Sequence, residues 1–213
     1  MISEKSEKRC GIMKLYFIRH GQTDWNVAGK IQGRMDIPLN DTGRIQARLL
    51  AEAMERRPVQ AVFSSPQKRA RETAEAVGSC QGVQVILLPQ LMEISYGVWE
   101  GRTTDDILET DRELFEAWWE HPSSVAPPGG ETLDQVRERC LEAWEQIKST
   151  LKGDSAIVSH GSTLAHLLSL ILEEERDDDD IVVGNASITT VEYEPGTGSC
   201  SLLEANDSSH LLL

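Results

Sequence analysis

Five side chains of chemically reactive types lie at or shortly after the ends of short apolar segments: Arg19, His20, Arg69, Glu93 and His160. The order apolar run, histidine, glycine occurs twice, once at His20 and again at His160. Short apolar runs that end at a turn signal are typical of strands buried on both faces of a parallel sheet. Because ligands bind outside the carboxyl ends of such strands, we expect the five side chains to meet at one edge of the sheet.

Two imidazoles, two guanidiniums and one carboxylate suit phosphoryl transfer without a metal ion. The planar forks of Arg19 and Arg69 match phosphate oxygens and would neutralise a phosphoryl dianion. One imidazole can act as a covalent nucleophile, while the other, cationic beside a bound phosphate, would stabilise the transferring group. Glu93 would protonate the leaving alkoxide and later activate water, a task that calls for a raised pKa. The pattern itself does not say which histidine is the nucleophile.

Two other classes of site use similar residues. A metal hydrolase could take His20, His160 and Glu93 as ligands, but two arginines would repel the cation and no H-E-x-x-H spacing is present. A non-catalytic anion-binding module would explain the arginines, but it leaves Glu93 and the second imidazole without a role. Phosphoryl transfer is therefore the favoured interpretation.

Alternating strand and helix patterns must position these residues, and they predict an α/β fold. Ser65 followed by Pro66 is a strong helix-start signal, so we expect Ser65 to cap a helix whose first residue is Pro66. Thr132–Gln135 has the pattern of a capping box and predicts the start of another helix. One of Asn40, Asp41 and Thr42 is expected to cap a helix that ends before Pro58. Residues 186–193 and 199–203 are predicted to form a closing hairpin. The predicted strands end near Ile18, Phe63, Leu88 and Val158.

Residues 103–130 are acidic and aromatic, and we expect them to form a cap or side lobe beside the sheet. Within this segment, Phe115 and Trp118 are predicted to lie on an amphipathic helix. A polar loop of more than a dozen residues follows Gly21, a length that is usual for functional loops. The acidic run 173–180 is interpreted as a solvated loop.

The overall composition excludes several classes of function. The 213-residue chain has a net charge of −14, which argues against a nucleic-acid partner, because phosphate backbones require clustered Lys and Arg. No apolar run approaches the roughly 20 residues of a membrane span, and the first nine residues lack the apolar core of a signal peptide. We therefore expect a cytoplasmic protein without a membrane partner. The four cysteines form no C-x-x-C pair, so free thiols are expected.

Several motifs together resemble the histidine phosphatase superfamily, in its phosphoglycerate-mutase-like branch. They are Arg19–Asn26 (RHGQTDWN), Ser64–Pro66 with Arg69–Ala74, Glu93 with Gly97 and Trp99–Gly101, and Val158–Gly161. The resemblance covers residues 15–203, nearly the whole chain, and implies a single domain over residues 1–213 with a small helical cap at about 94–130. It also implies a three-layer α/β/α sandwich, with helices on both faces of a mostly parallel sheet, and no metal or cofactor.

The resemblance also assigns roles to individual residues. It implies that His20 is the nucleophile that forms a phosphohistidine and that Glu93 is the acid–base. Arg19, Arg69 and His160 would bind the phosphoryl group together with Gly161, and Asn26 and Gln32 would add neutral hydrogen bonds.

Departures from the mutase pattern favour a phosphomonoesterase that acts on small phosphorylated metabolites. True mutases resemble Glu-Arg-His-Tyr-Gly where this chain has Glu93–Gly97 (EISYG), and they carry a longer basic insertion where this chain is acidic. The chain resembles the broad-specificity and α-ribazole phosphatases. Its residues Tyr96, Trp99, Trp118 and Trp119 are expected either to form an apolar or stacking wall for the leaving group or, for most of them, to belong to the core. Phosphoglycerate mutase and a non-catalytic phosphate-binding module are the alternatives, and a homodimer is left open.

Overall fold

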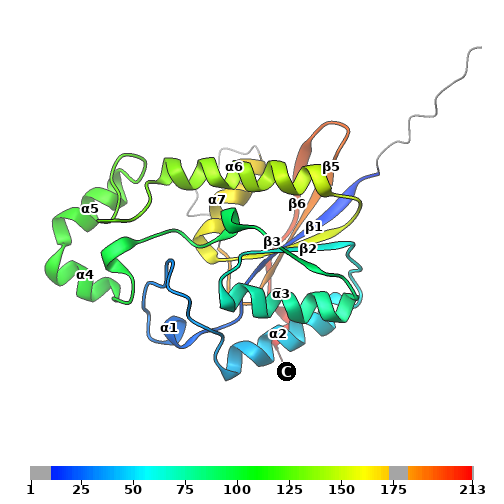
Figure 1. The fold of residues 1–213 in the computed structure, drawn as a ribbon, viewed down its shortest axis with the longest axis horizontal. Coiled ribbons are helices and arrows are strands. Elements are labelled where there is room, and N and C mark those ends of the chain that lie inside the picture. The colour runs from blue at the N-terminus through cyan, green and yellow to red at the C-terminus, as the bar shows by residue number, and fades with distance from the viewer. Residues whose placement is uncertain (1–10, 173–181, 213) are drawn as a thin grey trace, which may run out of the picture.

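A six-stranded sheet forms the centre of the protein (Figure 1). The computed structural model describes residues 11–172 and 182–212, so the acidic run 173–180 lies outside the described residues. The strand order is β3-β2-β4-β1-β5-β6; the first four strands are parallel, β5 pairs antiparallel with β1, and β6 pairs antiparallel with β5. The strands are β1 (Met13–Arg19), β2 (Ala61–Ser64), β3 (Val85–Leu87), β4 (Ser155–Ser159), β5 (Ile188–Glu194) and β6 (Ser199–Asp207).

Side-chain caps begin several of the helices, as the sequence predicted for two of them. Asn40 Oδ1 accepts a hydrogen bond from Gly43 N at 2.8 Å, and Thr132 forms the predicted capping box with Gln135. The helices of the described residues are α1 (Asp24–Val27), α2 (Asp41–Met54), α3 (Lys68–Gln81), α4 (Thr104–Thr110), α5 (Arg112–Glu120), α6 (Leu133–Thr150) and α7 (Gly161–Ile171).

The alternation of side chains along β1 produces a hydrophobic core on each face of the sheet. Leu15 and Phe17 belong to one core, together with buried side chains of α6 and α7. Tyr16 and Ile18 belong to the other core, together with buried side chains of α2 and α3. Figure 1 accordingly shows α6 and α7 on one face of the sheet and α2 and α3 on the other. The predicted three-layer architecture is therefore confirmed.

The start of α3 differs from the prediction. The helix begins at Lys68 with Gln67 as its N-cap and no side-chain cap hydrogen bond, so the prediction that Ser65 caps a helix beginning at Pro66 is wrong. Ser65 Oγ instead lies 2.9 Å from Nε2 of His160, and it accepts a hydrogen bond from Gln67 N at 3.3 Å. A tertiary contact with a residue far away in the sequence has taken the place of the local cap.

Helices α4 and α5 form a side lobe that extends away from the layered core (Figure 1). Trp99 lies at the centre of this lobe with 0% of its surface exposed, and its ring centroid is 5.6 Å from those of both Phe115 and Trp118. Trp118 also contacts the ring of Tyr96, with centroids 6.0 Å apart. Of the two alternatives for Trp99, the structure therefore supports a core residue of the lobe and not a part of the leaving-group wall.

The composition also led to expectations about disulfides and membrane-spanning helices. Cys80, Cys140 and Cys200 form no disulfide within the described residues, in line with the prediction for the cysteines. None of the helices within residues 11–172 and 182–212 is long and apolar enough to cross a bilayer.

Candidate active site

The register of the sheet places the two histidines side by side. Strands β1 and β4 are adjacent and parallel, and Arg19 pairs with Ser159. The next residue on each strand is a histidine, so His20 and His160 leave the sheet together, and their ring centroids are 5.1 Å apart. Both side chains are buried. The repeated strand, histidine, glycine pattern of the sequence therefore forms one site.

Arg69 lies between the two imidazoles. Its Nε is 3.3 Å from Nε2 of His20 and 3.1 Å from Nδ1 of His160. The loop after β1 holds the guanidinium, because Met35 O accepts from Nη1 at 2.8 Å and Gly33 O accepts from Nη2 at 2.9 Å. Burial lowers the pKa of Arg69 to about 10, which still leaves it a cation at neutral pH.

The hydrogen bonds of His20 determine which ring nitrogen carries the proton. Nδ1 lies 2.7 Å from the carbonyl oxygen of Gly21, which can only accept, so Nδ1 is the donor. Nε2 is then unprotonated and faces the Nε–H of Arg69. Gly21 allows this packing, since a Cβ at its position would lie 2.6 Å from the carbonyl oxygen of Gly43. His20 is thus a neutral imidazole whose Nε2 lone pair accepts from the Nε–H of Arg69, a donor that is shared with Nδ1 of His160.

His160 has the opposite arrangement. Its Nδ1 accepts from the Nε–H of Arg69, so in the neutral ring Nε2 carries the hydrogen and donates it to Ser65 Oγ at 2.9 Å. Arg69 contacts both rings, so the rings differ in the partner of the protonated nitrogen, which is the Ser65 hydroxyl for His160 and the Gly21 carbonyl for His20.

The surroundings of both imidazoles favour their neutral forms. Burial lowers the pKa of His20 well below its usual 6.5, and the positive charges of Arg69 and Arg19 lower it further. Burial likewise lowers the pKa of His160 well below 6.5, with Arg69 as the next contribution. The expectation of a cationic second imidazole therefore applies only when the negative charge of a phosphoryl group faces it.

Arg19 reaches the site from the end of β1. Its Nη1 donates to the carbonyl oxygen of Val183 at 2.6 Å, while its buried Nε has no hydrogen-bond partner among the described residues. Gly161 makes room for this side chain, because a Cβ there would lie 3.3 Å from Arg19 Cζ. A buried donor without a partner is a group that an incoming anion can satisfy.

Glu93 lies at the N-terminus of α7. Its Oε1 accepts hydrogen bonds from Thr163 N at 3.1 Å, Thr163 Oγ1 at 3.0 Å and Ile94 N at 3.0 Å. The backbone N–H of Glu93 donates to Gln67 Oε1 at 2.8 Å, which fixes the position of this residue relative to the start of α3. One carboxylate oxygen is therefore held in place, and Oε2 is the oxygen available to exchange a proton.

Two amides that the family resemblance assigned to phosphate binding have different surroundings. Asn26 Oδ1 accepts from Thr23 N at 3.0 Å and from Asn185 Nδ2 at 3.3 Å, so its own amide nitrogen remains as a donor. Gln32 is buried, and its Oε1 has no hydrogen-bond partner among the described residues. Their contact with a phosphoryl group stays a prediction.

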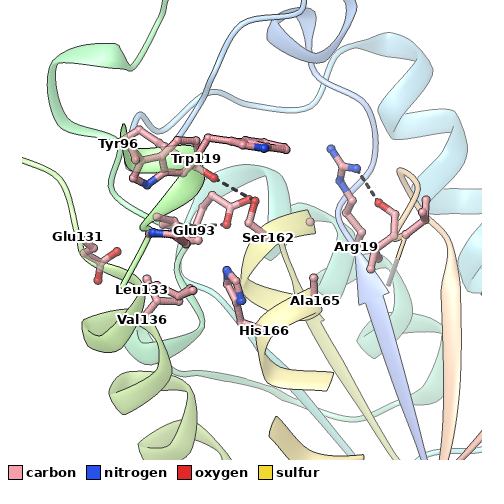
Figure 2. Close-up of a pocket in the computed structure, with 16 residues that line it drawn as sticks. Arg19, Glu93, Tyr96, Trp119, Glu131, Leu133, Val136, Ser162, Ala165 and His166 are labelled. Atoms are coloured by element: carbon pink, nitrogen blue, oxygen red, sulfur yellow. Dashed lines mark hydrogen bonds between the residues drawn. The ribbon is translucent and has the colours of Figure 1, made fainter. Parts of the chain in front are cut away.

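A pocket of about 600 Å³ adjoins Arg19 and Glu93. Figure 2 shows Arg19 on one side of it, Tyr96, Trp119 and Glu131 on the other, and side chains of α7 between them. His20, His160 and Arg69 are buried and do not line this pocket, so Arg19, Glu93 and Gly161 are the residues through which it adjoins the histidine centre. His20, His160 and Glu93 do not form a metal-ligand group, since no cluster of three His, Cys, Asp or Glu side chains in the described part of the chain is arranged to hold a metal ion.

Sequence reasoning missed three polar residues of the site and misassigned a fourth, Ser65. Gln67 and Thr163 hold Glu93, and each lies within three residues of Arg69 or His160, a proximity that could have drawn attention to them. Asn185 donates to the carbonyl oxygen of His20 at 3.0 Å, and no local signal in the sequence indicates this contact.

Two imidazoles, two guanidiniums and a carboxylate, gathered at the carboxyl ends of parallel strands, define a site of the phosphoryl-transfer class. Comparison with known families gives the same result: residues 15–206 match the histidine phosphatase superfamily (branch 1). The chain belongs to this superfamily, as the sequence motifs predicted.

Individual relatives carry several names. The "Metal-independent phosphoserine phosphatase" of Arabidopsis thaliana is 37% identical over 167 residues, which cover 76% of this chain and 70% of the relative. A "Probable phosphoglycerate mutase GpmB" of Photorhabdus laumondii subsp. laumondii is 32% identical over 205 residues, which cover 94% of this chain and 95% of the relative. The α-ribazole phosphatase structure from Shigella flexneri has a TM-score of 0.82 at 26% identity and covers 92% of this chain and 96% of its own.

Proposed function

We propose that the protein hydrolyses phosphomonoesters of small metabolites through a phosphohistidine at His20, without a metal ion. The observation that carries this proposal is the protonation of the His20 ring, in which Nδ1 donates to a carbonyl oxygen and the Nε2 lone pair lies beside Arg69. A buried neutral imidazole next to two cations is well placed to attack a phosphorus atom whose oxygens those cations hold. His160 donates its Nε2–H to Ser65 and accepts from Arg69 at Nδ1, so it would bind a phosphate oxygen after taking up a proton at Nδ1.

The proposed reaction consists of two displacements. In the first, His20 Nε2 bonds to phosphorus, the bond between phosphorus and the alcohol oxygen breaks, and Glu93 gives a proton to the departing oxygen. In the second, Glu93 takes a proton from water, the water oxygen bonds to phosphorus, and the bond from phosphorus to Nε2 breaks. Inorganic phosphate and free His20 are the products. Arg19, Arg69 and His160 hold the phosphoryl oxygens throughout.

The lining of the pocket favours hydrolysis over mutase activity. A mutase has to retain a bisphosphorylated intermediate, which requires cations beyond those that bind the transferred phosphoryl group. Among the described residues that line the pocket, Arg19 is the only arginine or lysine. Phosphoglycerate mutase activity is the second candidate, because a relative of that name matches 94% of this chain.

The test of the covalent mechanism is a rapid-quench experiment with a ³²P-labelled primary-alcohol phosphate ester. We expect wild-type protein to accumulate an acid-labile, base-stable label, and His20→Asn to accumulate none. Hydrolysis that is lost with a chelator and restored by a divalent ion would support a metal hydrolase instead. Tight binding of inorganic phosphate without label or turnover would support the binding module.

The mutase alternative is tested with 3-phosphoglycerate. We expect the release of inorganic phosphate whether or not the corresponding bisphosphate is present. Formation of 2-phosphoglycerate that depends on the bisphosphate, with little free phosphate, would favour the mutase.

A further inference from the structure

The wall of the pocket farthest from Arg19 is aromatic and apolar. Tyr96, Trp118 and Trp119 line it on the side of the lobe, and Leu133 and Val136 line it on the side of α6 (Figure 2). Trp119 has 63% of its surface exposed, which is unusual for so large an apolar side chain. A ligand that covers this ring would remove apolar surface from water.

The tryptophans of the wall are held in place before any ligand arrives. Trp118 packs edge-on against both Tyr96 and Trp99, with centroids 6.0 and 5.6 Å apart. Trp119 stacks on Phe115 at an interplanar angle of 20°. Because the rings are already ordered by their neighbours, stacking a flat ligand on them costs little conformational entropy.

The charges at this end of the pocket do not suit an acidic leaving group. Glu131 is ionised, because the hydrogen bonds and charges of Arg139 and Arg34 outweigh the effect of burial and lower its pKa. Glu131 Oε1 lies 2.8 Å from Arg139 Nε and 3.0 Å from Arg34 Nη2, so both nearby cations are already paired with it. A substrate carboxylate at this end would face Glu131 and Glu93, and the one arginine or lysine among the described residues of the lining, Arg19, lies at the opposite end.

Polar groups between the two ends can orient an uncharged ligand. Tyr96 Oη and Ser162 Oγ are 3.1 Å apart, and His166 lies on the same helix as Ser162 (Figure 2). Hydroxyl and imidazole groups of this kind can pair with ring nitrogens or sugar hydroxyls. The volume of about 600 Å³ lies within the range of pockets that take drug-sized ligands, and it exceeds what a three-carbon acid would fill.

We propose that the preferred substrates are phosphate esters whose leaving alcohol is uncharged or cationic and carries a flat aromatic or heteroaromatic ring. This ring stacks on the exposed Trp119 and meets Trp118, which is inclined at 66° to Trp119, edge to face. This inference rests on the proposed phosphatase function and narrows its substrate class. The phosphoryl group would lie at the histidine centre, the ring would lie against the lobe, and Glu93 would lie where the alcohol oxygen departs.

The test compares phosphate esters that all release a primary alcohol, so that differences in leaving-group reactivity are small. Adenosine 5′-monophosphate and 2-(1-naphthyl)ethyl phosphate represent the proposed class, and glycerol 3-phosphate, phosphoserine and 3-phosphoglycerate represent the others. We expect kcat/KM to be at least about tenfold higher for the two aromatic esters, a difference that matches the worth of one aromatic stacking contact. Equal values, or a preference for either carboxylate-bearing ester, would overturn the inference while hydrolysis itself upheld the proposed function.

Variants of the aromatic wall test whether a preference for aromatic esters depends on stacking against its tryptophans. We expect Trp119→Ala to lower kcat/KM about tenfold for 2-(1-naphthyl)ethyl phosphate and less than about twofold for glycerol 3-phosphate. Val98→Ala is the matched control, because Val98 is an exposed apolar residue beside Trp99, at 59%, and does not line the pocket. Equal losses with both esters would contradict the stacking contact. A phosphoserine preference that disappears in His166→Ala would assign this end of the pocket to a carboxylate and overturn the inference.

A binding measurement keeps the inference testable apart from catalysis. We expect adenosine to quench the tryptophan fluorescence of the wild-type protein with saturation, and more weakly in Trp119→Ala. Serine and glycerate should leave the fluorescence unchanged. An absence of quenching by adenosine would overturn the inference, and an absence of both turnover and phosphohistidine would instead show that the proposed function has failed.

Discussion

The two strand, histidine, glycine segments at 15–21 and 155–161 look alike in the sequence, but they are connected differently in the structure. A backbone carbonyl holds the proton of His20, whereas the Ser65 hydroxyl holds that of His160. The lone pair of His20 is therefore directed by the path of the main chain, and the ring of His160 is directed by side chains. The difference teaches that a repeated motif can supply two roles when its surroundings place the ring proton on a different nitrogen in each copy.

Replacement of each histidine should give the largest difference between the segments. We expect His20→Asn to lower kcat by about 10⁴-fold or more and to abolish the phosphoenzyme, because the attacking atom is lost. His160→Asn should lower kcat by only about 10²–10³-fold, since a stabilising contact is lost and the nucleophile remains. Steady-state kinetics and trapping of labelled protein measure both. A phosphoenzyme that forms in His20→Asn and not in His160→Asn would reverse the two roles.

Arg69 contacts both segments, so its replacement should affect them together. We expect Arg69→Lys to lower kcat/KM by about 10²-fold, because an ammonium group cannot reproduce the planar fork that reaches both imidazoles and two carbonyl oxygens. Arg71→Lys is the control, since Arg71 is exposed and pairs only with Glu75 among the described residues. Similar losses in the two variants would show that general positive charge, and not the geometry of Arg69, matters.

The dependence of stability on pH tests whether both rings are neutral in the folded protein. The pKa values of His20 and His160 are lowered well below 6.5, so the unfolded chain binds more protons than the folded protein as the pH falls below about 6.5. The free energy of unfolding should therefore fall on acidification, with a combined slope of up to about 2.7 kcal/mol per pH unit from these two groups. Urea unfolding between pH 7 and pH 5 measures this slope.

Single variants separate the two contributions to that slope. His20→Asn and His160→Asn should each reduce it by up to about one proton. His210, whose pKa burial also lowers, contributes in the same direction and is unchanged in both variants. An unaltered slope in either variant would show that the corresponding imidazole is already protonated in the folded protein.

Ser65→Ala should have the smallest effect and should act on one segment alone. It leaves the Nε2–H of His160 without its partner, so we expect a loss of about tenfold in kcat and about 1–2 kcal/mol in stability. The pH profile should shift as well, because His160 loses its fixed orientation. Ser64→Ala is the matched control, since Ser64 is a buried serine whose hydroxyl donates to the carbonyl oxygen of Ser65. Equal shifts of the pH profile in both variants would contradict a specific role for Ser65.

The elements of the fold could be predicted where apolar spacing and caps agree, as at β1, α2 and α6. The register of a parallel sheet then brings His20 and His160 together, and this follows from two strand ends alone. The protonation of each ring could not be predicted, because it depends on partners chosen by tertiary packing. Ser65 shows why: serine before proline is a good helix cap, and only the folded chain reveals that its hydroxyl contacts a residue 95 positions away.

The side lobe was the least predictable part of the site. Trp99 comes before the helical segment and Trp119 lies on it, and neither local pattern indicates that Trp99 is buried and Trp119 exposed. That distinction depends on how α5 packs against the segment around Tyr96, which no local signal specifies.

The loop between β1 and α2 carries a constraint on its length. The carbonyl oxygens of Gly33 and Met35 hold Arg69, and the side chain of Arg34, between them, is paired with Glu131 at the base of the side lobe. Of three consecutive residues, the first and third therefore contact the histidine centre through Arg69, and the second contacts Glu131 in the far wall of the pocket. Inserting or deleting one residue here would exchange these contacts. The length of this loop is therefore fixed, and a grafted loop would have to keep the same number of residues.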